Sequence, residues 1–403
     1  MDGALAGVRI LDLSAVLMGP FATQMLGDMG ADVIKIEPLD GDRTRHNGLG
    51  RNRGMSGWFM GFNRSKRSLA VDLKSPRGRE VMLRLVETAD VLLYNVRPDA
   101  MDRLGLGYAE VSAVNPNILY VGALGFGRGG PYSGLAAFDD LIQAATGMPW
   151  LFHFAGAAEP RFCPSPIVDR LMGTQVAMNI LGGLMARQRT GRGQQIDVPM
   201  FETMAQIMLG DHLGGDAFEP SIGPWGYRRM LAPERRPYRT KDGFVAALPY
   251  SAEQWRRFFA AVGRSHLYDE DPRFATRALQ LHNVNALYAM VAEILLERTT
   301  DHWFALFREL DIPAMVVSSI PDLIENPHLQ AVGFFEEVDH PTEGRMRQIR
   351  TPSRWSDTQP HARRPAPNAG EQSREILEEI GYRADEIETL LATNAIRQWS
   401  PAS

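Results

Sequence analysis

The feature that most constrains the fold of this chain is an alternation of short apolar runs with helical segments between Val8 and Ala123. Aliphatic residues dominate the runs, and glycine, proline or serine often punctuates the chain near their ends. Such an alternation predicts an α/β fold, in which parallel strands are connected by helices on both faces of one sheet. The predicted strands are Val8–Ser14, Asp32–Glu37, Ser68–Leu73, Asp90–Asn95 and Ile118–Ala123.

The helix after the third predicted strand has a clear start signal. Ser75 precedes Pro76, a pair typical of an N-cap followed by the first helical residue, and the helical pattern runs to Thr88. In open parallel sheets, ligands bind outside the carboxyl ends of the strands. The segments that we expect at this edge are Ser14–Gly19, Glu37–Arg45, Lys74, Asn95–Arg97 and Gly125–Gly130.

The length of the chain predicts two domains, because 403 residues exceed what one hydrophobic core usually accommodates. We expect a large α/β domain over residues 1–200, a linker over 201–240 and a smaller α+β domain over 241–325. The last segment, 326–403, contains a proline-dotted stretch that cannot form a core alone. We therefore expect it to return to the large domain, with a final helix over Ser373–Ala392.

Composition and charge exclude several classes of protein. A net charge of −5 gives no general attraction to nucleic acid or to an anionic membrane. No stretch approaches the roughly 18 apolar residues of a membrane span, and no signal peptide is visible. The single cysteine, Cys163, leaves no intramolecular disulfide. We expect a cytoplasmic protein that has neither nucleic acid nor membrane as a partner.

The first predicted strand carries no dinucleotide-binding motif, and the usual metalloprotease and serine-hydrolase motifs are missing. No G-x-G-x-x-G follows the first predicted strand, which disfavours a nicotinamide oxidoreductase. The glycine-dense segment Gly125–Gly130 is as typical of a turn as of a phosphate site. Neither H-E-x-x-H nor G-x-S-x-G occurs, so a metalloprotease-like site and a serine-hydrolase elbow are unsupported. We expect no metal site.

Asp169 has the most informative local surroundings in the chain. It follows Pro164 and Pro166 and precedes a long apolar pattern, which predicts a helix N-terminus close to it. Backbone N–H groups and the helix dipole favour negative charge there. The local pattern leaves two interpretations open: an N-cap aspartate, or a nucleophilic carboxylate kept ionised by the helix end.

Basic residues cluster near the predicted strand ends. Several of them converging on one sheet edge would suit a ligand that carries phosphates, since Arg and Lys pair well with phosphate oxygens. A solvated surface is the alternative for a run such as Arg64-Ser-Lys-Arg67. The residues are Arg43, Arg45, Arg64, Lys66, Arg67, Lys74, Arg97 and Arg103.

A series of motifs, in order along nearly the whole chain, resembles the family III coenzyme A transferases. This family includes formyl-CoA:oxalate and carnitine-linked enzymes. Each motif alone is weak, whereas their order and spacing together are specific. They are Leu5–Leu13 with Gly19-Pro20, Leu26–Pro38, Asn63–Ser68, Asp72–Lys74, Asp90–Asn95, Leu104-Gly105, Asp169 to Gly173, Arg189–Gln194 and Arg364–Glu371.

The resemblance implies a Rossmann-like large domain, an interlocked homodimer, no permanently bound cofactor, and acyl-CoA and a carboxylic acid as substrates. It places Asp169 at the nucleophile, which would form covalent aspartyl intermediates during CoA transfer. It also implies contacts with CoA at Leu17, Met18, Arg45, Val71, Asp72, Leu73, Lys74, Asn95, Val96, Arg97, Arg103, Ala136, Ala137, Phe138 and Asp139.

The chain departs from the family pattern at a few positions, and rival functions remain. Leu17 and Pro38 are apolar where family members can carry Gln and Arg. The main rival is a 2-methylacyl-CoA racemase, whose proton transfer needs an acid and a base; Phe138 stands where that chemistry typically has a histidine. An isomerase that shifts CoA within one dicarboxylic acid, and a non-catalytic CoA-binding protein, stay open.

Overall fold

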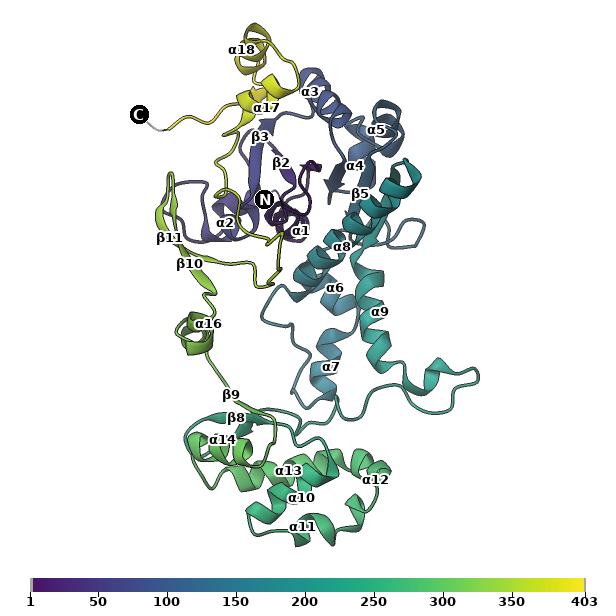
Figure 1. Ribbon diagram of the computed structural model, residues 1–403. Coiled ribbons are helices and arrows are strands. Elements are labelled where there is room, and N and C mark those ends of the chain that lie inside the picture. The colour runs from purple at the N-terminus through teal and green to yellow at the C-terminus, as the bar shows by residue number, and fades with distance from the viewer. Residues whose placement is uncertain (1–2, 402–403) are drawn as a thin grey trace. The chain divides into compact units, whose positions relative to one another are not determined.

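The computed structural model describes residues 3–401, which form two compact units (Figure 1). Unit 1 contains the described chain up to Ile142, Ser165–Met204 and the chain from Pro327 onward. Unit 2 contains Gln143–Pro164 and Ala205–Asn326. The C-terminal segment thus belongs to unit 1. Residues 143–164 belong to unit 2, although the residues directly before and after them belong to unit 1.

Unit 1 is built on a seven-stranded sheet in the order β12-β3-β2-β1-β4-β5-β6. The last six strands are parallel, which confirms the predicted α/β class, and β12 is antiparallel to β3 at one edge. The order 3-2-1-4-5-6 is that of the Rossmann fold, with its topological switch point between β1 and β4. The strands are β1 (Arg9–Asp12), β2 (Asp32–Glu37), β3 (Lys66–Val71), β4 (Val91–Tyr94), β5 (Leu119–Leu124), β6 (Gln194–Pro199) and β12 (Ile396–Arg397).

Strand β3 begins two residues before the predicted start, with Lys66 and Arg67. Both are charged, so an apolar pattern does not include them. Both are nevertheless buried, because Lys66 pairs with Asp12 and Arg67 with Asp32. Burial of a charge is tolerated when an opposite charge and hydrogen bonds accompany it.

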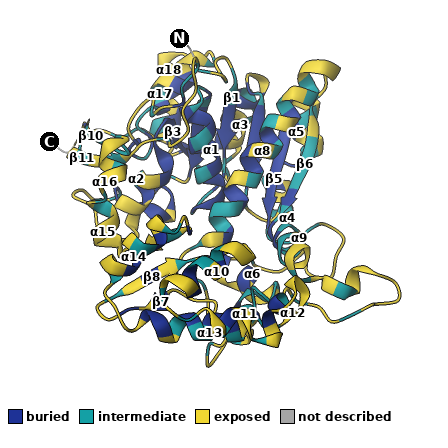
Figure 2. Ribbon diagram, turned by 60° about the horizontal axis from the view of Figure 1, so that its bottom comes forward, coloured by how far each residue is buried: buried dark blue, intermediate teal, exposed yellow. Residues whose placement is uncertain are grey.

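Helices cover both faces of the sheet, and the strands between them are buried (Figure 2). On one face an apolar core joins the sheet to α3 (Pro76–Glu87), α4 (Pro98–Arg103), α5 (Tyr108–Val114), α17 (Ser373–Glu379) and α18 (Ala384–Ala392). The other face is covered by α1 (Met18–Asp28) and α8 (Ile167–Thr190), with α2 (Gly57–Asn63) beside α1. As predicted, Ser75 caps α3: its hydroxyl accepts the Gly78 N–H at 3.0 Å.

The C-terminal part of unit 1 differs from the prediction in two ways. The single helix expected over Ser373–Ala392 is two helices, α17 and α18, because Gly381 adopts a φ of +86°, which a helix interior does not allow. The segment after α16 (Pro327–Ala331) also contains an unpredicted hairpin. Its strands are β10 (Phe335–His340) and β11 (Gly344–Ile349).

Unit 2 combines a small antiparallel sheet with helices around an aromatic core. The sheet has the order β7-β8-β9, and the predicted Asp242-Gly243 turn joins its first two strands. Its core includes Trp255, Phe258, Trp303 and Phe307. The elements are α7 (Met148–Phe154), β7 (Tyr238–Arg239), β8 (Phe244–Ala247), α10 (Ala252–Ala261), α11 (His266–Asp269), α12 (Arg277–His282), α13 (Val284–Leu295), α14 (Thr300–Glu309), β9 (Ala314–Val316) and α15 (Ile320–Ile324). The connecting helices α6 (Asp139–Ala145) and α9 (Met200–His212) complete the chain.

Candidate active site

Asp169 lies in the first turn of α8, as the sequence predicts, but it is not the N-cap. Pro166 occupies the N-cap position, and its carbonyl accepts the Arg170 N–H at 3.1 Å. Proline has no side chain that can cap, so another residue supplies the acceptor: Asp139 Oδ2 accepts the Asp169 backbone N–H at 2.9 Å. The N-cap interpretation of Asp169 is therefore wrong, and its carboxylate is left to act elsewhere.

The surroundings of Asp169 oppose the charge that a nucleophile needs. Burial, followed by the nearby Asp139 carboxylate, raises the pKa of Asp169 to about 7. Asp140 acts in the same direction, whereas the guanidinium of Arg170 lowers the pKa. A carboxylate with a pKa near neutrality exchanges between both forms at physiological pH, which is the behaviour of groups tuned for chemistry.

Helices α8 and α1 meet at a close contact beside Asp169. A Cβ on Gly173 would lie 2.8 Å from the Met18 carbonyl oxygen and 2.9 Å from Phe21 Cδ1. Only glycine permits such an approach. Because residues three and four apart share a helix face, Asp169 and Arg170 lie on the same side of α8 as Gly173. The first turn of α8 therefore faces the start of α1.

The loop that leads into α1 lies at the switch point of the sheet. Asn95, directly after β4, donates to the Ala15 carbonyl at 2.8 Å and accepts the Ala15 N–H at 2.9 Å. The next residue, Val16, has a φ of 72°. A branched side chain is strained in this left-handed region, and such strain persists only where the surroundings enforce it. The loop is thus held in one conformation across the β1–β4 crevice.

Buried charged side chains also hold the loop that leads into α1. Lys66 Nζ donates to Asp12 Oδ2 at 3.0 Å, to the Pro20 carbonyl at 2.9 Å and to Asn63 Oδ1 at 2.9 Å. Burial lowers the pKa of Lys66 to about 8. The lysine thereby ties β1 and the first turn of α1 to α2.

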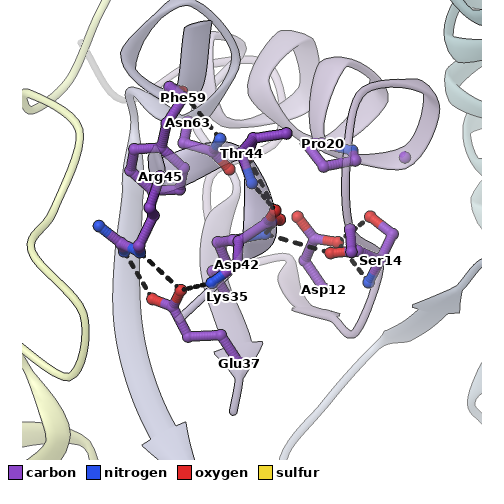
Figure 3. Close-up of polar contacts among 12 residues, drawn as sticks. Asp12, Ser14, Pro20, Lys35, Glu37, Asp42, Thr44, Arg45, Phe59 and Asn63 are labelled. Carbon is purple, nitrogen blue, oxygen red and sulfur yellow. Dashed lines mark hydrogen bonds and ion pairs between the residues drawn. The ribbon is translucent and has the colours of Figure 1, made fainter. Parts of the chain in front are cut away.

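A second buried lysine completes this network (Figure 3). Lys35 Nζ donates to the Ser14 carbonyl at 3.1 Å and to Asp42 Oδ2 at 2.9 Å. Burial opposes the charge on Asp12, but Lys66, Lys35 and hydroxyl donors outweigh it and lower the pKa of Asp12 to about 2. Both ends of the β1–α1 loop are therefore fixed by ammonium groups.

Arg45 belongs to the same buried region and is occupied by protein groups. Its guanidinium donates to Glu37 at 2.6 and 2.8 Å and to the Pro367 carbonyl at 3.0 Å, and it lies 3.8 Å from the Phe59 ring centroid. The structure likewise encloses Arg64 and Arg67 in ion pairs, with Asp28 and Asp32. These arginines shape the interior, and their charges are already balanced.

Three basic side chains remain accessible in one cleft of unit 1. The cleft has a volume of about 520 Å³ and lies between the start of α3 and the end of α4. Of the predicted residues, it is lined by Leu73, Lys74 and Arg103. Arg79 also lines it and was missed by sequence reasoning. Its position one helical turn after Ser75 was an available signal, because residues four apart share a helix face.

The other predicted contacts divide into buried and exposed groups. Leu17, Met18 and Val71 are buried, so only their backbone or a fraction of their surface can meet a ligand. Asp72 is partly buried, and its Oδ1 accepts the Lys74 N–H at 3.0 Å. The exposed or partly exposed residues are Val96, Arg97, Ala136, Ala137 and Phe138, while Asp139 is buried.

Residues 3–401 contain neither a membrane-spanning helix nor a cluster of metal-binding side chains. No helix in this range has both the length and the apolar character required to cross a bilayer. No group of three or more His, Cys, Asp or Glu side chains within the same range is arranged to hold a metal ion.

Comparison with known proteins defines the class of this fold and site. The model of CoA-transferase family III matches residues 5–373, and the chain belongs to this family of CoA-transferring enzymes. It is 33% identical to an acyl-CoA transferase of Fusarium pseudograminearum over 96% of this chain and 87% of the relative. It is 32% identical to succinyl-CoA:glutarate CoA-transferase of Mus musculus over 98% of this chain and 90% of the relative.

A solved structure supports the same assignment. The crystal structure of a CAIB/BAIF family protein from Brucella suis matches with a TM-score of 0.79 and 29% identity, covering 94% of this chain and 100% of that one. The expected family and the expected class of enzyme are therefore confirmed.

Proposed function

We propose that this enzyme moves CoA from an acyl-CoA to a free carboxylic acid through covalent intermediates on Asp169. The Asp169 carboxylate attacks the thioester carbonyl and expels CoA thiolate, which gives a mixed anhydride. The thiolate attacks the aspartyl carbonyl and releases the first acid, which leaves an aspartyl-CoA thioester. The acceptor carboxylate then repeats both steps in reverse and restores the Asp169 carboxylate.

The observation that carries this proposal is the position of Asp169 in the first turn of α8, on the face turned to the start of α1. The helix N-terminus favours the carboxylate form, and burial removes the water that would weaken it as a nucleophile. The named activity of the mouse relative, succinyl-CoA:glutarate CoA-transferase, is of the same chemical kind.

We propose that the cleft beside α3 holds the phosphates of CoA. Lys74, Arg79 and Arg103 line it and supply the cations that phosphate oxygens require. Arg45 is buried and paired with Glu37, and in this scheme it stabilises the fold of this region and does not contact CoA. CoA is a substrate here, so no permanently bound cofactor is needed.

The test is to trap the covalent intermediate. The enzyme is incubated with succinyl-CoA and then with hydroxylamine, and the modified peptide is located by mass spectrometry. We expect the modification on Asp169 and no turnover by Asp169→Asn, whereas Asp99→Asn, an exposed aspartate on α4, serves as control. Modification at another residue, or turnover that survives in Asp169→Asn, would refute the proposal.

A racemase has less support, because Phe138 is 62% exposed and has no group that exchanges a proton. Exchange of the α-proton of an acyl-CoA in deuterium oxide, without CoA transfer, would favour it. A shift of CoA within one dicarboxylic acid uses the same aspartate and is distinguished by isotope labelling of the two carboxylates.

We also propose that the enzyme acts as a homodimer in the cytoplasm. Large apolar side chains of unit 2 are exposed in the single chain, among them Trp150, Phe152 and Phe154. Exposed apolar patches of this kind often mark an interface. Light scattering coupled to size-exclusion chromatography tests the expected twofold mass.

A further inference from the structure

Arg170, the neighbour of Asp169, has an unusual environment. Its Cζ lies 4.3 Å from the centroid of the Phe62 ring and 4.8 Å from that of Phe21. Within residues 3–401, its guanidinium has no hydrogen-bond or ion-pair partner. The side chain is partly buried, and burial lowers the pKa of Arg170, opposed by the charge of Asp169.

Two rings satisfy only part of what a guanidinium offers. Ring faces attract the cation, but the five N–H donors need acceptors, and a partly buried donor without one is costly. Elsewhere in unit 1, buried arginines are fully engaged: Arg45 pairs with Glu37, and Arg64 with Asp28. Arg170 is instead oriented by two aromatic rings, and its N–H donors remain without acceptors within residues 3–401.

The charges around Arg170 change during the proposed reaction. The acidic group that acts on it is Asp169 on the same helix turn, and Asp139 and Asp140 at the start of α6 act in turn on Asp169. Once Asp169 is converted into a thioester, its negative charge is gone. The guanidinium then loses its nearest counterion at the step when a carboxylate anion has to enter.

We propose that Arg170 binds the carboxylate group of the acceptor acid during the second half of the reaction. This inference rests on the proposed function. The planar guanidinium forms paired hydrogen bonds to a carboxylate, and Phe21 and Phe62 hold it in place beside the aspartyl thioester. An oxygen of the bound carboxylate attacks the aspartyl carbonyl and expels CoA thiolate. The thiolate then attacks the acyl carbon of the acceptor and expels the Asp169 carboxylate.

Measuring the two half-reactions separately distinguishes binding of the acceptor carboxylate by Arg170 from a general contribution of Arg170 to the structure of the site. Succinyl-CoA serves as donor and glutarate as acceptor, the pair in the mouse relative's name. The first half is followed as the rate of hydroxylamine-trapped aspartyl adduct without glutarate. The second is followed as glutaryl-CoA formed at increasing glutarate concentration. The variants are Arg170→Met, which keeps packing on the rings, and Arg170→Lys, which keeps the charge.

We expect Arg170→Met to raise the KM for glutarate by about tenfold to a hundredfold, the loss expected when a charged hydrogen-bonded group is removed. Loss of the Arg170 charge raises the pKa of Asp169, so adduct formation is compared on its high-pH plateau, where Asp169 is ionised in every variant. There the KM for succinyl-CoA and the rate of adduct formation should change little, and Arg170→Lys should recover part of the loss in glutarate binding. Arg84→Met is the matched control, because Arg84 also lies over a ring, 4.2 Å from the Tyr382 centroid, on outer helix α3.

Two results would overturn the assignment. An unchanged KM for glutarate in both variants would show that Arg170 does not bind the acceptor. An equal loss in both half-reactions, with no recovery in Arg170→Lys, would show a structural role. Absence of any trapped adduct in the unmodified enzyme would instead refute the proposed function itself.

Discussion

At the scale of single residues, the chemistry depends on the protonation of Asp169. Attack requires the ionised form, and the pKa of Asp169 is raised from its usual value to about 7, first by burial and then by Asp139. The ionised fraction therefore grows as pH rises through this value. We expect the rate of adduct formation from acyl-CoA to rise with pH and to reach half of its plateau near pH 7.

Variants of the neighbours test the cause of this shift. Asp139→Asn removes a negative charge but keeps an oxygen that can accept the Asp169 N–H. The pKa of Asp169 should then fall, and the midpoint of the rate profile should move to lower pH. Asp140→Asn should move it in the same direction by less, since Asp140 is exposed and its effect is the smallest of the causes. A midpoint unaffected by Asp139→Asn would contradict this account.

Sequence reasoning found some residues of the site and missed others for physical reasons. Prolines before an apolar pattern were enough to place Asp169 at a helix start. The pattern could not show that Asp139, thirty positions earlier, would cap that helix, because this contact depends on tertiary structure. Nor could it separate Arg45, which is balanced by Glu37, from Lys74 and Arg103, which remain accessible.

At the scale of elements, the β1–α1 loop depends on Asn95. Asn95→Ala removes both hydrogen bonds to Ala15 and frees the strained Val16 to relax. We expect a higher KM for acyl-CoA and a destabilisation of about 1–3 kcal/mol, the usual cost of leaving backbone groups unsatisfied. Steady-state kinetics and urea unfolding measure the two effects.

A matched asparagine supplies the control for that experiment. The side chain of Asn115 likewise bonds to backbone groups: it donates to the carbonyls of Val86 and Ala89, both at 2.8 Å, next to α5. Asn115→Ala should lower stability to a similar degree without changing the KM for acyl-CoA. Equal kinetic effects of the two variants would mean that Asn95 has no special role at the site.

The contact between α8 and α1 gives a second element-scale prediction. Gly173→Ala would place a methyl group 2.8 Å from the Met18 carbonyl oxygen and so force the helices apart, at a cost of about 1–3 kcal/mol. The rate of adduct formation should fall as well, since Asp169 moves with its helix. Gly182→Ala, also in α8 but with open space around it, should instead stabilise by up to about 1 kcal/mol. Thermal unfolding of both variants checks the difference in sign.

The strength of local signals determined which elements were predictable. Buried parallel strands have continuous apolar runs, so β2 was placed at its observed bounds, and Ser75-Pro76 fixed the start of α3. The hairpin β10–β11 was missed because its strands carry charged residues on an exposed surface, where no apolar alternation develops. The break between α17 and α18 depends on one glycine, Gly381, within an otherwise helical pattern.

At the scale of the whole molecule, the end of the chain completes the sheet of its first part. Ile396 is 2% exposed and pairs with Val71 across the sheet edge. We expect Ile396→Ala to lower the free energy of unfolding by about 2–4 kcal/mol, the typical cost of truncating a buried isoleucine. Ile349→Ala, on a 54% exposed strand residue, should change it by less than about 0.5 kcal/mol. Urea denaturation measures the free energy of unfolding of both variants. An equal decrease in the two would contradict the importance of this sheet edge.

The same pairing has a consequence during synthesis on the ribosome. Strand β3 leaves the ribosome more than three hundred residues before its edge partner β12. At typical translation rates this interval lasts on the order of tens of seconds. An uncovered strand edge is a template for pairing with other chains. The outer edge of β3 therefore stays open to such pairing until β12 has been translated and closes it.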